Sequence, residues 1–258
     1  YYDISLKEYR RNQLTGKNFK FFCQDINEIK ITETQFDLAI NLAAQAGVRV
    51  QKEKEYLYEH SNILGFQAFC NFCLLNNIKK IIYASSSSVY CDNISEKFSE
   101  NNAKLKPKSK YGLSKLANEN YAGKIASESD ISIIGLRFFS VYGPYGRPDM
   151  AYFLFTEALK KSKNIYLNNK GLMARDMTYI DDVIRGIEGA IKYLFEEKIQ
   201  IKNEIFNLGN NLPITTNNLL LALMKKLNKK SEIKYCYTQN EAKITHADIT
   251  KAKNLLGY

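Results

Sequence analysis

The sequence has no long hydrophobic run, few cysteines and only two histidines. Its apolar stretches are far shorter than the roughly 20 residues that a helix needs to cross a bilayer. The N-terminal residues, YYDISLKEYRRNQL, also lack the pattern of a signal peptide. From these absences we expect a soluble, cytoplasmic protein with no membrane partner.

The five cysteines do not form a disulfide ladder. Cys70 and Cys73 lie in CNFC, within a helical pattern and without a second pair, so buried thiols are favoured over a metal or redox site. Asp176, Asp181 and Asp182 resemble a metal cluster, but acidic residues at a helix N-terminus are the preferred interpretation. We therefore expect no metal site.

The net charge is strongly positive, because 37 basic minus 27 acidic residues gives +10. Such a charge suits an anionic partner. Lysine, asparagine and isoleucine are nevertheless frequent throughout the chain, as a coding bias would produce, and no dense basic run is interleaved with aromatics. We expect no nucleic-acid partner, whereas a negatively charged small molecule remains open.

Short apolar runs alternate with amphipathic segments along the 258 residues, of which 45% are hydrophobic. That length and composition allow one large α/β domain with a smaller lobe. Near-continuous apolar strands separated by helices predict a parallel sheet covered on both faces, which is the doubly wound α/β class. The predicted strands are 19–26, 36–44, 78–86, 131–139 and 204–209, and the predicted helices are 56–77, 110–128, 150–162, 180–195 and 216–228.

Four serines follow the predicted strand IKKIIYA directly. In doubly wound sheets, ligands bind beyond the carboxyl ends of the strands. Ser85–Ser88 are therefore expected to line the site. One serine alone would also suit a turn or a helix cap, but four in a row beside the features below favour a site.

Tyr111 and Lys115 in YGLSK are four residues apart and share one face of the next predicted helix. A free tyrosine has a pKa of about 10, and a nearby ammonium favours the phenolate and lowers that value. A Y-x-x-x-K pair alone is weak evidence. Its position, one strand-to-helix step after the serines, indicates an acid/base group.

A set of motifs runs through the chain in order: NLAAQAGVR (41–49), YASSSSVY (83–90), YGLSK (111–115), GLRFFSVYGPYGRPDM (135–150), RDMTYIDD (175–182), FNLGN (206–210) and ADITKAKNLLGY (247–258). With this set the chain resembles the extended short-chain dehydrogenase/reductase family (NAD-dependent epimerase/dehydratase), and within it the UDP-glucuronate 4-epimerase branch. The resemblance implies a Rossmann-like fold, NAD as cofactor and a UDP-sugar substrate. It also implies a homodimer formed by the helices at 56–77 and 110–128.

The resemblance divides the chain into two domains. Residues 1–145 and 176–209 would form the NAD-binding domain, and residues 146–175 and 210–258 the small substrate lobe. The implied catalytic residues are Ser86, Tyr111 and Lys115. Those implied at the cofactor are Asp25, Ile26, Leu42, Ala43, Ala44, Asn62 and Phe138, together with Tyr111 and Lys115; those at the substrate are Ser87, Ser88, Ser140, Arg147, Arg49 and Arg175.

The implied reaction begins when Tyr111, as a phenolate, takes the proton of the sugar 4-hydroxyl while Ser86 hydrogen-bonds the same oxygen. Hydride passes from C4 to NAD, the 4-keto sugar turns over in the pocket, and hydride returns to its other face. Relatives that remove water or carbon dioxide carry an acidic residue after the catalytic hydroxyl, where this chain has Ser87 and Ser88. Dehydratase and decarboxylase activities are therefore disfavoured.

Arg147 bears on the identity of the sugar. The resemblance places it at the carboxylate of glucuronate, which the planar fork of arginine suits; the alternative is a surface arginine that caps the loop. We expect UDP-glucuronate to be converted to UDP-galacturonate. The alternatives are a UDP-glucose 4-epimerase or another nucleotide-sugar epimerase/dehydratase, and an inactive family member that binds a nucleotide sugar or a partner protein.

The chain departs from the family at its start, where no Gly-rich turn G-x-x-G-x-x-G precedes a helix. Gly16 is a lone turn glycine. By the resemblance, residue 1 falls just after the second strand of the fold, so we expect that roughly 30 to 40 residues, about one β-α-β unit, are missing. We also expect very poor NAD affinity for these 258 residues alone.

Overall fold

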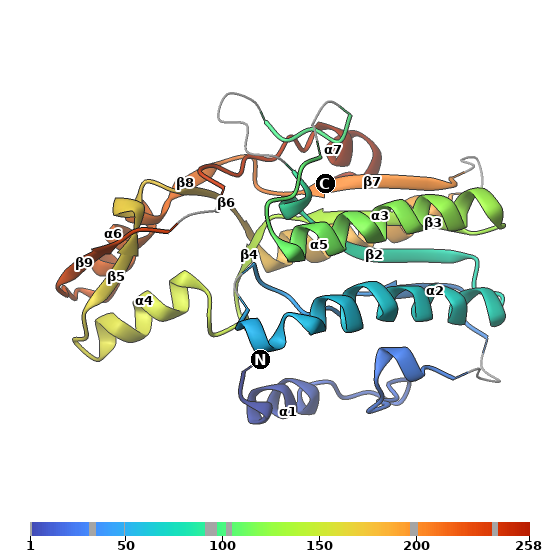
Figure 1. Cartoon of the computed structure of the whole chain (residues 1–258), viewed down its shortest axis with the longest axis horizontal. Coiled ribbons are helices and arrows are strands. Elements are labelled where there is room, and N and C mark those ends of the chain that lie inside the picture. The colour runs from blue at the N-terminus through green and yellow to red at the C-terminus, as the bar shows by residue number, and fades with distance from the viewer. Residues whose placement is uncertain are drawn as a thin grey trace.

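A parallel sheet of four strands forms the centre of the computed structural model, which describes residues 2–30, 35–48, 50–90, 97–101, 105–196, 201–238 and 242–258. Helices cover both faces of this sheet (Figure 1). The prediction of a doubly wound, Rossmann-like α/β fold is therefore confirmed. The strand order is β1 (Ala39–Asn41), β2 (Lys80–Ser86), β3 (Ser132–Phe138) and β7 (Asn203–Leu208).

Neighbouring residues of the central strands serve opposite faces of the sheet. Ile81 and Ile133 pack with α2 (Gly65–Leu75) and α3 (Lys110–Glu128). Ile82 and Ile134 pack with α5 (Ile180–Leu194) and α7 (Thr250–Leu256). Because both faces are buried, the strands read as continuous apolar runs rather than as alternating ones.

A smaller lobe has a core of its own, at the left of Figure 1. Strands β5 (Ile165–Asn168) and β9 (Ile233–Cys236) pair in parallel, and α4 (Ala151–Lys160) and α6 (Thr216–Leu227) pack beside them. A third sheet joins the lobe to the central sheet. It consists of β4 (Ser140–Tyr142), β6 (Ala174–Tyr179) and β8 (Pro213–Thr215).

Helix α3 has the bounds that the sequence predicts, because its start is capped. The Ser109 hydroxyl accepts a hydrogen bond from the Gly112 N–H at 3.0 Å, which satisfies one of the unpaired amides of the first turn. The predicted helix 56–77 is divided into a π-helical stretch, η3 (Tyr58–Leu64), and α2. The remaining short helices are η1 (Ile26–Glu28), η2 (Lys52–Lys54), η4 (Ser87–Val89) and η5 (Asn169–Gly171).

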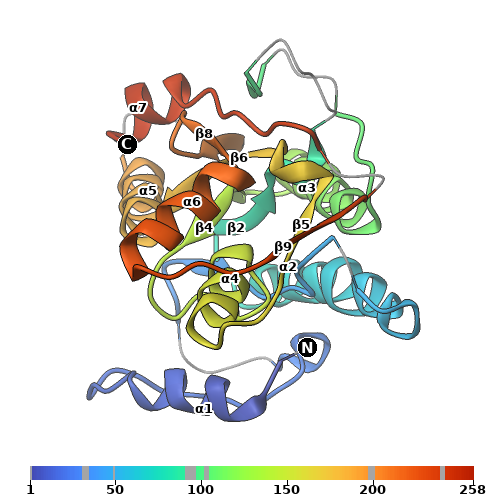
Figure 2. The same cartoon turned by 90° about the vertical axis from the view of Figure 1, so that its left-hand side faces the viewer.

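The predicted strand at 19–26 is wrong. Residues 19–25 have no regular structure, and η1 follows them. This segment and α1 (Ile4–Asn12) lie apart from the central sheet (Figure 2). The apolar residues that motivated the prediction are exposed: Phe21 is 54% and Phe22 71% accessible. A strand is stable only with a partner, and in the described part of the chain nothing pairs with this segment.

Within the described ranges, no helix combines the length and the apolar character that crossing a bilayer requires.

Candidate active site

A cavity of about 660 Å³ opens at the carboxyl ends of the central strands. Strands β1, β2 and β3 end at Asn41, Ser86 and Phe138, and the last two residues are paired in register. This is the edge at which doubly wound sheets bind their ligands. The loop after β1, the four serines, the start of α3, the 138–152 segment and the first turns of α5 contribute to the lining.

Ser86, Tyr111 and Lys115 all line this cavity, as the sequence predicts. The Ser86 hydroxyl accepts a hydrogen bond from the Ser88 N–H at 3.1 Å, which fixes its position at the end of β2. Lys115 is buried, its Nζ donates to the Ala84 carbonyl at 2.7 Å, and it lies 6.0 Å from the centroid of the Tyr111 ring. The three side chains thus meet at one end of β2.

The pKa of Tyr111 differs from the sequence-based expectation. Burial raises it above its usual value, and the hydrogen bond with Ser86 and the charge of Arg147 act in the opposite direction. The pKa of Lys115 is lowered to about 8, because burial disfavours its ammonium form more than the nearby Glu119 carboxylate favours it. The expected lowering of the Tyr111 pKa is therefore wrong for this structure, in which the cost of burying a phenolate dominates.

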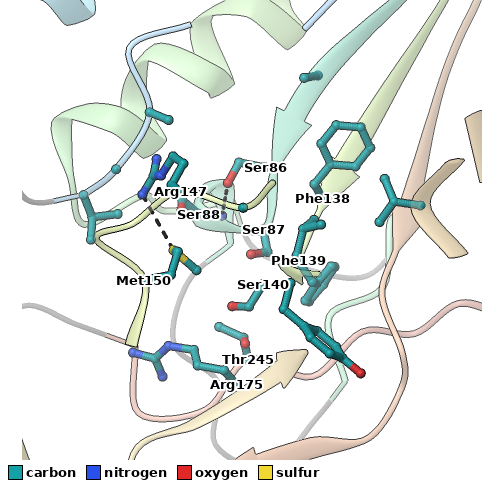
Figure 3. Close-up of a pocket in the computed structure, with 18 of the residues that line it drawn as sticks. Ser86, Ser87, Ser88, Phe138, Phe139, Ser140, Arg147, Met150, Arg175 and Thr245 are labelled. Carbon is teal, nitrogen blue, oxygen red and sulfur yellow. Dashed lines mark hydrogen bonds between the residues drawn. The ribbon is translucent and has the colours of Figure 1, made fainter. Parts of the chain in front are cut away.

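The predicted substrate residues Ser87, Ser88, Ser140 and Arg147 line the same cavity. In Figure 3 the serines lie between the loop that carries Arg147 and the segment from Phe138 to Ser140. The guanidinium of Arg147 donates two hydrogen bonds to the Asp149 carboxylate, at 3.1 and 2.9 Å. This pair holds the arginine fork at the wall of the cavity.

Arg175 also lines the cavity. In Figure 3 it lies beside Thr245, at the end of the cavity away from Ser86. Its guanidinium donates to the carbonyls of Ala174 and Ala242, at 2.9 and 2.8 Å, so it joins β6 to the segment before Thr245. Arg49, the third predicted arginine, lies outside the described residues.

The loop after β1 forms one wall of the cavity through Leu42 and Ala44. Ala43 does not line it; its N–H donates to the Asn41 side chain at 2.9 Å. Phe138 lines the cavity from the end of β3. Four of the residues that the sequence assigned to the cofactor alone are thus in or beside the cavity.

Asn62 lies behind this loop and not in the cavity lining. Its amide accepts from the Gln45 N–H at 2.7 Å and donates to the Gln45 carbonyl and the Ser114 hydroxyl, at 3.1 and 2.9 Å. Asn62 is 1% exposed. It therefore holds the loop against α3.

Asp25 and Ile26 also lie away from the cavity lining. Asp25 caps η1 by accepting from the Asn27 N–H at 2.9 Å, and its carboxylate lies 3.6 Å from the His60 ring. Ile26 packs against the core between α2 and the sheet. The pair lies at the junction of η3 and α2, where Ile26 packs closely on Gly65.

Several lining residues were not anticipated. Tyr142, Tyr145 and Tyr152 come from the β4–α4 segment, and the Tyr142 ring lies 5.4 Å from that of Tyr179. Thr245 reaches the cavity because its segment returns beside β6, where its hydroxyl accepts from the Asp176 N–H at 3.1 Å. No local pattern around Thr245 signals this return, which is a tertiary feature.

Two acidic residues are placed as predicted and one is not. Asp181 and Asp182 lie in the first turn of α5. Asp176 is instead a fully buried residue of β6, whose carboxylate accepts from the N–H groups of Asn210 and Ala247, at 2.6 and 2.9 Å. Because each carboxylate oxygen has a backbone partner, Asp176 joins β6 to the chain at Asn210 and at Ala247.

Cys70 and Cys73 are fully buried in the core between α2 and the sheet, as the sequence predicts. Burial raises the pKa of both thiols to about 12, which keeps them protonated and unreactive.

A Rossmann-like fold, with hydroxyl groups and a buried lysine at the carboxyl edge of its sheet, defines the class of this protein. The model of the NAD dependent epimerase/dehydratase family matches residues 9–209, which is more than half of the chain. The chain belongs to this family.

Several curated relatives match the whole chain, including UDP-glucuronate 4-epimerases of two different organisms. A UDP-glucuronate 4-epimerase of Arabidopsis thaliana is 38% identical over 277 residues, covering 100% of this chain and 63% of the plant protein. One from Thermodesulfobacterium geofontis is 37% identical over 267 residues, covering 100% of this chain and 80% of the relative. The chain thus spans less than two thirds of the plant enzyme's length.

A solved structure has the same architecture. The UDP-glucuronic acid 4-epimerase of Bacillus cereus, in complex with UDP-glucuronic acid and NAD, superimposes with a TM-score of 0.89 at 32% identity. The superposition covers 99% of this chain and 81% of the Bacillus protein.

Proposed function

We propose that the protein is an NAD-dependent epimerase that converts UDP-glucuronate to UDP-galacturonate through a 4-keto intermediate. The observation that carries the proposal is that Ser86, Tyr111 and Lys115 share one cavity with Arg147. The first three residues suit oxidation and reduction at a sugar hydroxyl, and the arginine suits a carboxylate. Relatives with this name match the chain from end to end.

The residues around the cavity fit the nicotinamide end of NAD. Ala44, Gly47 and Ala84 are small and leave space beside the strand ends. Within the described residues, Lys115 uses one of its three N–H groups on the Ala84 carbonyl, so two remain for a ribose hydroxyl. A Gly-rich turn for the pyrophosphate does not occur in the 258 residues. The proposed cofactor contacts are those of Leu42, Ala44 and Phe138 in the cavity, with Asp25 and Ile26 beside the adenine.

NAD, when bound, accepts the hydride of the sugar C4 and returns it. The phenolic oxygen of Tyr111 takes the proton of the 4-hydroxyl and later gives it back, while the Ser86 hydroxyl hydrogen-bonds the same sugar oxygen. Because burial raises the pKa of Tyr111, its ionised form depends on nearby cations. Lys115, whose Nζ lies 6.0 Å from the centroid of the Tyr111 ring, and Arg147, whose charge lowers the Tyr111 pKa, are two cavity-lining cations near it.

The carboxylate of glucuronate would bind between Arg147 and the hydroxyl groups of Ser87 and Ser88, while Ser140 and Arg175 would contact the rest of the nucleotide sugar. Arginine binds carboxylates through two parallel hydrogen bonds. A neutral sugar is the second candidate, since Arg147 already has Asp149 as a partner and needs no further anion. UDP-glucose is therefore the competitor to test.

The test uses protein expressed from the complete gene, supplied with UDP-glucuronate and UDP-glucose in equal amounts. The anomeric protons are followed by NMR, and we expect signals of UDP-galacturonate alone. Growth of UDP-galactose instead would contradict the assigned sugar. Binding of either sugar without conversion would identify an inactive family member.

Tyr111→Phe is the control for the catalytic assignment. It removes only the phenolic oxygen, so we expect turnover to fall by about 10³-fold while the circular dichroism spectrum is unchanged. Turnover at the wild-type rate would contradict the acid/base role of Tyr111.

We further propose that the enzyme works in the cytoplasm as a homodimer formed by the helices at 56–77 (η3 and α2) and 110–128 (α3); α2 and α3 lie on one face of the sheet. The chain would be divided into two domains that bind different ligands. Residues 1–145 and 176–209 would bind NAD, and residues 146–175 and 210–258 would form the lobe that binds the nucleotide-sugar substrate. The separate core of the lobe supports this division.

A further inference from the structure

A buried charged cluster lies directly behind the proposed active site. It consists of Ser85, Tyr90, Glu119, Arg137 and Asn207, each less than a tenth exposed. The Arg137 guanidinium donates to both oxygens of Glu119, at 2.8 and 2.7 Å, and to the Tyr90 hydroxyl at 2.7 Å. The Ser85 hydroxyl donates to Glu119 at 2.5 Å, and the Tyr90 hydroxyl donates to Asn207 at 2.7 Å. We call these residues the Glu119 cluster.

The Glu119 cluster is tied to the site by position. Ser85 and Arg137 are paired in the register of β2 and β3, one residue before Ser86 and Phe138. Glu119 lies one helical turn after Lys115 on the buried face of α3. A change of charge in the cluster therefore acts on Lys115 with little screening by water, and it reaches Tyr111 through Lys115, whose Nζ lies 6.0 Å from the centroid of the Tyr111 ring.

The charges behind the site do not balance. Lys115 and Arg137 are two buried cations, and Glu119 is a buried carboxylate that pairs with Arg137 and lies one turn from Lys115. Ionisation of Tyr111 would bring the sum to zero. Tyr90 of the cluster is itself titratable, and further titratable groups near these charges are Tyr83 on β2, Glu100 against Asn207, and Arg147 from the β4–α4 loop.

We propose that Glu119 and Arg137 are positioning residues that set the pH range in which Lys115 is charged and Tyr111 is ionised. Glu119 favours the ammonium form of Lys115. Arg137 binds both oxygens of Glu119 and so keeps that carboxylate from cancelling the field of Lys115 at Tyr111. This inference rests on the proposed acid/base roles of Tyr111 and Lys115.

Stability alone does not account for such a pair. Burying two ions costs about as much as their attraction returns, and apolar residues of similar volume often serve a core equally well. Burial lowers the pKa of Lys115 to about 8, and Glu119 opposes that shift. Without Glu119, Lys115 would lose its proton at a lower pH. The ammonium would then be absent at pH values at which the proposed mechanism needs it to stabilise the Tyr111 phenolate.

The test is the pH dependence of kcat for UDP-glucuronate epimerisation, measured on protein from the complete gene. Glu119→Gln removes a negative charge, so we expect both the acidic and the alkaline limits to move down by about one pH unit. Arg137→Gln leaves the carboxylate uncompensated, so we expect both limits to move up by a similar amount. The double variant removes both charges, so its limits should lie between those of the two single variants and, because Glu119 is the nearer charge to Lys115, below those of the wild type.

Tyr90→Phe is the matched control, since it removes two hydrogen bonds of the cluster without a change of charge. Its pH limits should stay at the wild-type values whatever happens to its stability. A purely structural role for Glu119 and Arg137 predicts lower kcat with unmoved limits in all variants, and that result would overturn the inference.

Each single variant leaves one buried charge unpaired, so folding is checked first by thermal unfolding. One folded single variant is enough for the test, because each has its own predicted direction: the pH limits move down in Glu119→Gln and up in Arg137→Gln. If neither folds, Glu119→Asp retracts the carboxylate by one methylene and should move both limits in the direction of Glu119→Gln by a smaller amount; unmoved limits would overturn the inference.

The wild type and Tyr111→Phe separate this inference from the proposed function. If the wild type is inactive, or Tyr111→Phe is active, the proposed function itself fails. If both behave as expected and the limits do not move, only the role of the Glu119 cluster fails.

Discussion

Lys115 is a buried ammonium on α3, and its pKa is lowered to about 8 from 10.5. The native state therefore binds its proton more weakly than the unfolded chain does. Between about pH 8 and 10.5 the unfolded state holds more protons, so this group makes the free energy of unfolding rise with pH in that window and penalises the fold fully below it. The lysine is a cost to stability at neutral pH.

Lys115→Met should consequently stabilise the fold while it removes activity. We expect a gain on the order of 2 kcal/mol at pH 7, allowing for the lost bond to the Ala84 carbonyl, and a smaller gain at pH 10. Denaturant unfolding of both proteins at the two pH values measures it. A loss of stability at pH 7 would show that the ammonium is well solvated or paired.

Arg147 should discriminate between an acidic and a neutral sugar. Arg147→Ala removes the fork that would hold the uronate, so we expect kcat/KM to fall about 100-fold for UDP-glucuronate and at most about threefold for UDP-glucose. Arg147→Lys keeps the charge without the fork and should give an intermediate loss. Equal losses on both sugars would contradict the contact with the carboxylate.

At the scale of elements, α3 is pressed against η4 at Gly112. A methyl group there would overlap the Ser88 carbonyl oxygen and the Pro107 ring. Gly112→Ala should therefore push the Tyr111 turn away from Ser86. We expect a loss of about 2 kcal/mol in stability and of about 100-fold in turnover, since small displacements are costly in catalysis.

Gly123→Ala in the same helix is the matched control. Its added methyl meets only the Asn203 side-chain amide, at 3.2 Å, and that side chain can move. We expect it to be neutral or stabilising by about 0.5 kcal/mol, with full turnover. Unfolding curves measure the stability of the two variants, and initial rates measure their turnover. Equal stability and equal turnover in Gly112→Ala and Gly123→Ala would refute the close contact at Gly112.

The elements that the sequence predicts well are those whose own residues decide their structure. The strands at 78–86 and 131–139 are near-continuous apolar runs, and the helix at 110–128 begins after the capping residue Ser109. The observed β2, β3 and α3 follow these predictions closely. The cavity residues Ser86, Tyr111 and Lys115 were predictable because the carboxyl edge of such a sheet has a known role.

The failures depend on distant parts of the chain. The apolar run at 19–26 needed a pairing partner that the described residues do not supply. Strands β5 and β9 are separated by more than sixty residues, and neither has a strong local pattern. The raised pKa of Tyr111 could not be predicted either, because the degree of burial is a property of the folded molecule.

At the scale of the whole molecule, the proposed dimer should depend on exposed apolar residues of its helix pair. Leu64 and Leu113 are 48% and 54% accessible on η3 and α3. The double change Leu64→Lys and Leu113→Lys should convert a dimer to a monomer, because buried lysines oppose association. Sedimentation velocity measures the mass.

Leu154→Lys is the control for this experiment, since Leu154 is 50% accessible but lies on α4 in the smaller lobe. Its mass should remain that of the wild type. A monomeric wild type, or a dimer that survives the double change, would contradict the proposed interface.

The central claim is that C4 of the sugar is oxidised and reduced within one cavity, without exchange with water. The direct test is to supply UDP-glucuronate carrying deuterium at C4 to the enzyme in ordinary water and to analyse the product by mass spectrometry and NMR. The account predicts UDP-galacturonate that retains the deuterium at C4, because the same hydride returns to the opposite face. Product with protium at C4 would contradict the account, since it would mean that the configuration changes by exchange with solvent.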